Sequence, residues 1–201
     1  MTDWIKETLY SNGVLRNKLG IKDQQRLADR EYLLTATREL IILQQKPVIN
    51  DISLLNEIHQ FMFSPLYTWA GKYRSGDFSK CNTHFLEHTR FNFAKQDINN
   101  IINRLNNKKG LQDKEYALLL ERLNYMHPFR EGNGRSIRTF LQCFAANHQQ
   151  VIDYPRNNQQ MIKAQHNSDI EGIAALISLQ NTPTREMAFL ELMLRYRDTK
   201  H

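Results

Sequence analysis

The chain has 201 residues, of which 41% are hydrophobic, and it carries a formal net charge of +6. This length is enough to bury one core and does not require a second domain, so we expect a single domain over residues 1–201. The aliphatic runs are too short to span a bilayer and the N-terminus lacks an apolar leader, which predicts a cytoplasmic protein, with export as an effector left open. Two cysteines far apart in the sequence, Cys81 and Cys143, are expected to be reduced thiols.

Apolar residues recur with the period of a helix through most of the chain, whereas strand-like alternation is scarce, so the predicted class is all-α. The first long helix is expected to begin behind Asp23 as its N-cap and to end before Pro47. Its predicted buried residues are Leu27, Tyr32, Leu33, Leu40 and Leu43. Further helices are predicted over 51–63, 93–107, 114–126, 135–147, 159–165, 170–180 and 184–197.

A different pattern separates the second of these helices from the third. The segment "WAGKYRSGDFSKCNTHFLEH", residues 69–88, contains glycines, small polar residues and a few alternating positions, which is typical of a short β-hairpin. We therefore expect a surface flap there. Tyr67 and Trp69 are expected to pack at its base rather than to stack on a nucleobase.

The segment "HPFREGNGRSIR", residues 127–138, concentrates charged residues and glycines directly after a predicted helix. Pro128 disfavours helical geometry at the residue before it, so the helix should stop at Met126 and present His127 at its end. Taken alone, a histidine in that position is more often a complement to the helix dipole or a core-edge residue than a catalytic base. The residues that follow favour the interpretation of His127 as a catalytic base.

These following residues predict a phosphate-binding loop. Gly132 and Gly134 flank Asn133, and glycines permit positive φ and close backbone approach, so that successive N–H groups can converge on a phosphate. The next helix begins immediately afterwards and adds its free N–H groups and its dipole. Arg135 and Arg138 lie one turn apart on that helix, a placement that an anion would complete. A P-loop is excluded, because no strand precedes the segment and the GxxxxGK[ST] spacing is missing.

Two further residues of the segment suggest a metal ion and a packing role. Glu131 precedes the loop, where a phosphate would repel a bare carboxylate; Mg²⁺ bridging the carboxylate and phosphate oxygens removes that conflict. The alternative is a solvated acid paired with Arg130. Phe129 is interpreted as a hydrophobic anchor of the loop. The whole set suits transfer of part of a nucleoside triphosphate to a nucleophile that His127 deprotonates.

These residues resemble the motif of the Fic family, HxFx(D/E)GNGRxxR, and residues 127–138 match every specified position. "LRNKLGIKD" at 15–23 and "IHQFMFSPLYTWAGKYR" at 58–74 extend the resemblance to the bacterial toxin type of this family. The resemblance implies an all-α Fic fold with a β-hairpin flap next to the active-site loop. It divides the chain into an N-terminal extension and helix over about 1–50, a core over 51–182 and a C-terminal helix over 183–201.

Fic proteins usually transfer AMP from ATP to a hydroxyl side chain of a target protein, with release of pyrophosphate. The resemblance implies that His127 is the general base and that Glu131 holds Mg²⁺. It assigns the β-phosphate to Arg135, the γ-phosphate to Arg138, and phosphate oxygens to Gly132, Asn133 and Gly134. Strand-like pairing with the flap would align the target at Ser79, Lys80, Cys81, Asn82, Thr83, His84 and Phe85.

Two alternatives stay open at this point. Some relatives phosphorylate their targets or transfer other phosphate-containing groups, although the GNGR portion, which such relatives typically alter, is intact here. In another class, the basic charge suits a helical nucleic-acid-binding module. No helix carries a basic stripe with interleaved aromatics, so direct nucleic-acid binding is not expected.

Fic proteins are commonly restrained by a helix carrying (S/T)xxxE(G/N), whose glutamate occupies the γ-phosphate clamp. Two partial matches occur, at 35–40 with Glu39 and at 182–187 with Glu186, and both depart at the last position. The N-terminal resemblance instead implies a separate small antitoxin protein as partner. If neither internal segment is inhibitory, we expect that nothing within the chain fills the Arg138 clamp.

Overall fold

The structure is a computed structural model that describes residues 4–77, 79–80, 83–156 and 158–198. Its helices are α1 (Trp4–Glu7), α2 (Gln24–Gln45), α3 (Ser53–Phe63), η1 (His88–Arg90), α4 (Phe91–Asn106), α5 (Asp113–Met126), α6 (Asn133–Asn147), α7 (Gln159–His166), α8 (Ile170–Ala174) and α9 (Arg185–Asp198). Its strands are β1 (Ser79–Lys80), β2 (Thr83–His84), β3 (Gln150–Asp153) and β4 (Ser178–Asn181). The all-α prediction is confirmed.

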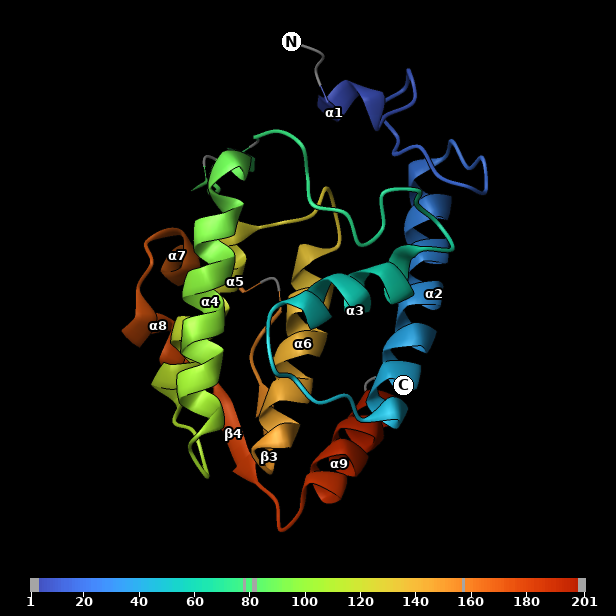
Figure 1. The fold of residues 1–201 in the computed structure, drawn as a ribbon. Helices are drawn as coiled ribbons and strands as arrows, with labels where there is room; N and C mark the ends of the chain where they lie inside the picture. The colour runs from blue at the N-terminus through green and yellow to red at the C-terminus, as the bar shows by residue number, and fades with distance from the viewer. Residues whose placement is uncertain (1–3, 78, 81–82, 157, 199–201) are drawn as a thin grey trace.

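Helix α6 occupies the middle of the bundle, between α4 and α5 on one side and α2 and α9 on the other (Figure 1). It contacts α3, α5, α9 and β3. Its apolar residues Ile137, Phe140 and Phe144 are buried, and small residues such as Ala145 let neighbouring helices approach closely. A helix surrounded in this way has little freedom to shift, so the loop before it ends at a fixed point.

The bounds of α2 confirm the predicted start and stop. Asp23 Oδ1 accepts a hydrogen bond from the Arg26 N–H at 2.7 Å, and the helix ends at Gln45, with Lys46 in the left-handed conformation before Pro47. The predicted buried face is partly wrong, because Tyr32 and Leu33 are each 55% exposed.

The buried face of α2 instead carries polar residues. Leu27 and Leu43 are buried as expected and Leu40 is half-buried, but between them the helix turns Glu31, Thr35 and Glu39 inward. A pattern of apolar residues cannot reveal this face, because here the buried groups are satisfied partly by polar partners on neighbouring elements. One of those partners is Arg135, described below.

The helix predicted over 170–180 is also wrong in its second half. Helix α8 stops at Ala174, and residues Ser178–Asn181 form β4, which pairs antiparallel with β3 from Gln150↔Asn181 to Asp153↔Ser178. Val151 and Ile152 of β3 are buried beside α6, and β4 covers the open edge of this strand. The pair fixes Asp153 next to the central helix.

A second two-stranded sheet confirms the hairpin. Strand β1 pairs antiparallel with β2 in the register Ser79↔His84 and Lys80↔Thr83, while Cys81 and Asn82 lie outside the described residues. Within the described parts of the chain, no helix is both long and apolar enough to cross a bilayer.

Candidate active site

His127 lies where α5 ends. It adopts the left-handed conformation with φ of +42°, and its N–H donates to Leu123 O at 3.1 Å, so it closes the helix as a C-cap. The ring stacks on Phe85, directly after β2 of the flap, with centroids 3.7 Å apart and planes at 14°. Nδ1 lies 3.3 Å from Asn124 O. When Nδ1 carries the proton and donates to this carbonyl, Nε2 is the nitrogen that can take a proton from a substrate.

A buried arginine supports the same helix end. The Arg74 side chain donates to His127 O at 3.0 Å and to Gly76 O at 2.7 Å, and its backbone N–H donates to Pro128 O. Arg74 therefore ties the base of the flap to the loop that begins at His127. Sequence reasoning missed this residue, because an arginine before a hairpin gives no sign that it is buried.

The loop between His127 and α6 is closed by its own side chains. Phe129 is fully buried, and the Asn133 side chain accepts from the Phe129 N–H at 2.9 Å and donates to Phe129 O at 2.8 Å. The placement of Phe129 is the one that an anchor requires. Because the Asn133 side chain is used within the loop, Asn133 could contribute to phosphate binding through its backbone N–H.

His59 holds the other side of this loop. Its ring stacks on Phe129 at 3.8 Å, Nδ1 accepts from the Gly71 N–H at 2.8 Å, and Nε2 donates to Glu131 O at 2.9 Å. Burial lowers the pKa of His59 to about 4. The ring is thus neutral at physiological pH and both of its nitrogens are bonded. This histidine was not singled out from the sequence, where it lies within an ordinary helix.

Gly132 makes the turn into α6. It has φ of +81°, and an added Cβ would lie 2.4 Å from Phe63 Cζ, so no other residue fits without displacing that ring. Helix α6 begins at Asn133, two residues before the predicted start. Its first internal bond runs from the Ser136 N–H to Gly132 O, which leaves the N–H groups of 133–135 pointing out of the helix end. Gly134 is helical and open, with no atom near an added Cβ.

Arg135 is held by α2. Its Nη2 pairs with Oε1 of Glu31, and its guanidinium carbon lies 4.8 Å from the centroid of the Phe63 ring. Glu31 also accepts from the Tyr67 hydroxyl, and Tyr67 stacks on Trp69 at 4.3 Å. Tyr67 is therefore buried in the core, and Trp69 is partly buried and packs against it.

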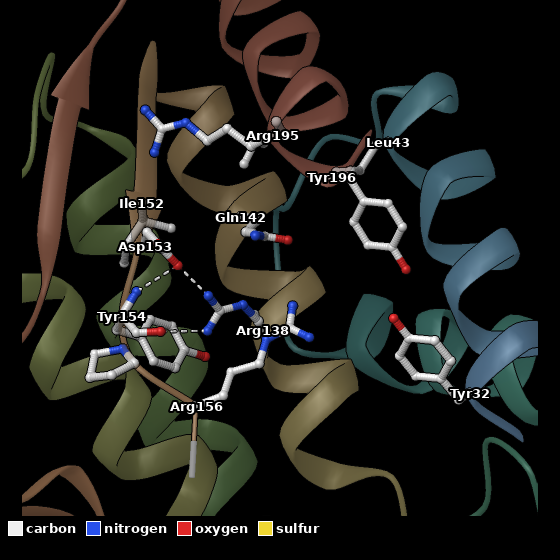
Figure 2. A pocket seen from close by; sticks show the side chains of 12 residues that line it. Tyr32, Leu43, Arg138, Gln142, Ile152, Asp153, Tyr154, Arg156, Arg195 and Tyr196 are labelled. Atoms are coloured by element: carbon white, nitrogen blue, oxygen red, sulfur yellow. Dashed lines mark hydrogen bonds and ion pairs between the residues drawn. The ribbon is translucent and has the colours of Figure 1, made fainter. Parts of the chain in front are cut away.

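Arg138 is engaged by β3, as Figure 2 shows. Its Nη1 donates to Tyr154 O at 2.7 Å, its Nη2 pairs with Asp153, and its guanidinium carbon lies 4.5 Å from the Tyr154 ring centroid. The expectation that nothing within the chain fills this clamp is wrong, because Asp153 occupies part of it. Within the described residues, Nε of Arg138 is buried and has no hydrogen-bond partner.

A basic cavity adjoins Arg138. It has a volume of about 390 Å³ and, in Figure 2, is bordered by α2, α6, α9 and the segment after β3. Charged, amide and phenolic groups line it, among them Arg138, Gln142, Arg156, Arg195, Tyr32 and Tyr196. Of its three guanidinium groups, Arg138 pairs with Asp153 and Arg195 pairs with Glu191, so acids of the chain already balance part of the positive charge around the cavity.

Neither partial inhibitory match supplies the acid that pairs with Arg138. Glu39 is buried, and burial raises its pKa, while the charges of Arg156 and Arg138 oppose that rise. Glu186 lies exposed in the first turn of α9. It precedes Leu192, the first residue of α9 that lines the cavity, by six positions, roughly 9 Å along a helix.

Glu131 offers one carboxylate beside the helix end. Its Oε1 accepts from the Gly132 N–H at 3.0 Å, whereas Arg130 turns to the N-terminal segment and donates to Thr8 Oγ1 at 2.8 Å. Among the described residues, no three acidic, histidine or cysteine side chains cluster as a metal site. A single carboxylate fits Mg²⁺ when phosphate oxygens and waters supply the remaining ligands.

The described flap residues lie as expected next to this site. Ser79 and His84 are exposed, Lys80 and Thr83 contribute backbone to the hairpin, and Phe85 reaches His127. The flap base is fixed by Asp77, whose Oδ1 accepts from the His88 N–H at 2.7 Å and from Arg74 at 3.1 Å.

Comparison with known proteins agrees with this geometry. Residues 50–145 match the Fic/DOC family. The protein adenylyltransferase VbhT of Bartonella schoenbuchensis is 34% identical over 158 residues, which cover 76% of this chain and 33% of VbhT. The probable protein adenylyltransferase Fic of Escherichia coli K12 is 31% identical over 139 residues, 66% of this chain and 68% of that protein. The chain thus spans about a third of the length of VbhT and two thirds of that of Fic.

Solved structures show the same fold. The N-terminal Fic domain of a VirB-translocated effector from Bartonella quintana, with bound ADP, matches with a TM-score of 0.76 at 23% identity, covering 90% of this chain and 98% of that one. The BepC protein from Bartonella tribocorum, with bound AMPPNP, matches with a TM-score of 0.72 at 22% identity, covering 88% and 98%. Fold, motif and relatives together define a Fic-fold protein. The chain belongs to the Fic/DOC family.

Proposed function

We propose that this protein transfers AMP from ATP to the hydroxyl of a tyrosine, threonine or serine of a target protein and releases pyrophosphate. The observation that carries the proposal is the single loop that brings His127, the open N–H groups of α6 and two arginines together. The relatives named protein adenylyltransferase support the same activity.

In this proposal His127 takes the proton of the target hydroxyl as its oxygen attacks the α-phosphorus. The bond from that phosphorus to the oxygen bridging to the β-phosphate breaks, and pyrophosphate leaves. The N–H groups at 133–135 and the positive end of the α6 dipole face the developing charge. Arg135 binds the β-phosphate and Arg138 the γ-phosphate, for which Arg138 has to share or give up its contact with Asp153.

Mg²⁺ and the flap complete the proposed site. Glu131 would hold the ion against the phosphates, where the ion would neutralise charge on the leaving group. The main chain of β1 and β2 would pair with an extended segment of the target and bring its hydroxyl to His127.

Restraint by a separate small antitoxin is part of the same proposal, as is action in the cytoplasm of the producing cell. Expression of the chain alone should then slow growth, and co-expression of the antitoxin should restore it. Glu39→Gly and Glu186→Gly test the internal alternative, because a large rise in activity from either variant would show that the chain restrains itself.

The decisive assay is incubation of the purified protein with Mg²⁺, a cell lysate and ATP labelled at either the α- or the γ-phosphorus. We expect label on protein from the α-position only, and His127→Ala as the matched control should abolish it. Label from the γ-position only would contradict the proposal in favour of phosphorylation. Absence of both labels together with tight retention on DNA would favour a nucleic-acid-binding module.

A further inference from the structure

The first arginine of the motif is supported by a carboxylate from outside the motif. Glu31 accepts from Arg135 at Oε1 and from the Tyr67 hydroxyl at Oε2. Its side chain is only 12% exposed. Because each carboxylate oxygen has its own donor, the acid cannot turn without losing one of the two bonds.

The surroundings keep this arrangement in place. The Phe63 ring lies 4.8 Å from the Arg135 guanidinium carbon, and Trp69 stacks on Tyr67 with planes at 13°. Burial, together with the negative charge of Glu31, raises the pKa of the Tyr67 phenol. Tyr67 therefore keeps its proton and remains the donor to Glu31 across the physiological pH range.

We infer that Glu31 and Tyr67 are positioning residues that orient Arg135 towards the β-phosphate of a bound nucleotide, an inference that rests on the proposed function. Glu31 engages Nη2, and the arginine side chain is 31% exposed, so its other N–H groups can face a ligand. Without the carboxylate the long side chain would regain rotamers that nucleotide binding must then restrict. If Glu31 instead competed with phosphate for Arg135, removing its charge would strengthen ADP binding rather than weaken it.

Titration calorimetry with ADP and with AMP, in the presence of Mg²⁺, separates these roles, because only ADP carries a β-phosphate. Glu31→Gln should weaken ADP binding by about tenfold or more and change AMP binding by less than about twofold. Glu121→Gln is the matched control. Glu121 is also buried, pairs with Arg122 and accepts from the Ser168 hydroxyl, and it should leave the ratio of ADP to AMP affinity unchanged.

A double-mutant cycle measures the coupling between Glu31 and Arg135 in ADP binding, which a merely structural role of Glu31 would not produce. If Glu31 acts through Arg135, Glu31→Gln should cost nothing further in an Arg135→Ala background. Tyr67→Phe should show a smaller loss of the same kind, and it carries the test if Glu31→Gln does not fold. Unchanged or tighter ADP binding by the variant that is used would overturn the inference, as would fully additive losses. Neither binding assay requires AMP transfer, so a wild-type protein without transfer activity would overturn the proposed function alone.

Discussion

The two arginines of the motif lie one helical turn apart, yet the chain holds them in contrasting ways. Arg135 pairs with Glu31, a buried acid on a long helix that also bonds Tyr67. Arg138 pairs with Asp153, whose side chain is 54% exposed at the end of a short strand. The guanidinium groups differ the other way, since the Arg135 side chain is 31% exposed and that of Arg138 is 10% exposed, so the contrast lies in the two acids. A buried carboxylate is costly to leave without its partner, whereas a half-exposed one exchanges readily with water. Glu31 is therefore the fixed partner of Arg135, and Asp153 is the partner that Arg138 can release.

In the proposed site both arginines bind the nucleotide, and His127 performs the proton transfer. His127→Ala should therefore retain ATP binding but lose AMP transfer by at least ~10²-fold, the usual scale for a positioned general base. Calorimetry with ATP and a transfer assay on the same preparation check the two halves of this statement. Transfer at the wild-type rate would make His127 a structural residue.

Low pH should lower the stability of the fold through His59, which holds the loop before α6. Burial holds the pKa of His59 at about 4, below the ordinary value of 6.5, so the unfolded chain binds a proton that the folded chain does not between these two pH values. Stability is then fully present above pH 6.5 and is lost as the pH falls towards about 4, by roughly 1–3 kcal/mol.

Urea unfolding at several pH values measures this loss. His59→Gln should lower stability at neutral pH but flatten the profile, and His148, whose pKa burial also lowers, should keep part of the slope in both proteins. An unchanged profile in the variant would show that His59 is not the titrating group.

Removing the second arginine should change the preference between nucleotides. Arg138→Ala should weaken ATP binding by roughly 1.5–3 kcal/mol, the cost of one charge-assisted contact, and ADP binding much less. Calorimetric titration with both nucleotides is the measurement. An equal loss for the two would mean that Arg138 does not meet the γ-phosphate.

The smallest effect is expected at the exposed acid. Asp153→Asn removes the charge that competes with the γ-phosphate for Arg138, so ATP should bind more tightly, by less than about 1 kcal/mol because the pair is half-exposed. ADP binding should not change. If Asp153→Asn instead weakened ATP binding as strongly as Glu31→Gln weakens ADP binding, the contrast between a fixed and a releasable acid would be lost.

The motif-bearing loop was predictable because its signals are local. Pro128 marks the end of α5, Gly132 marks the turn into α6, and the glycines and small polar residues of 69–88 indicate the hairpin. The structure confirms the helical class, the hairpin and the end of α5 at Met126. The roles of the individual site residues stay predictions.

The partners of the arginines were not predictable in this way. Glu31 precedes Arg135 by 104 positions, on a helix face whose buried residues are polar and so give no apolar signal. Asp153 belongs to a strand whose partner, β4, was predicted as helix because short apolar runs fit either period. Contacts of this kind depend on tertiary packing, which a pattern within one segment does not contain.

The central claim is that the transferred group is AMP and that His127 is required to transfer it. Mass spectrometry of the modified protein, after incubation of wild type and His127→Ala with Mg²⁺ and ATP, tests this most directly. We expect a peptide whose hydroxyl side chain carries AMP, formed together with pyrophosphate by the wild type only. A peptide that carries phosphate alone, or the same AMP adduct formed at equal rate by the variant, would contradict it.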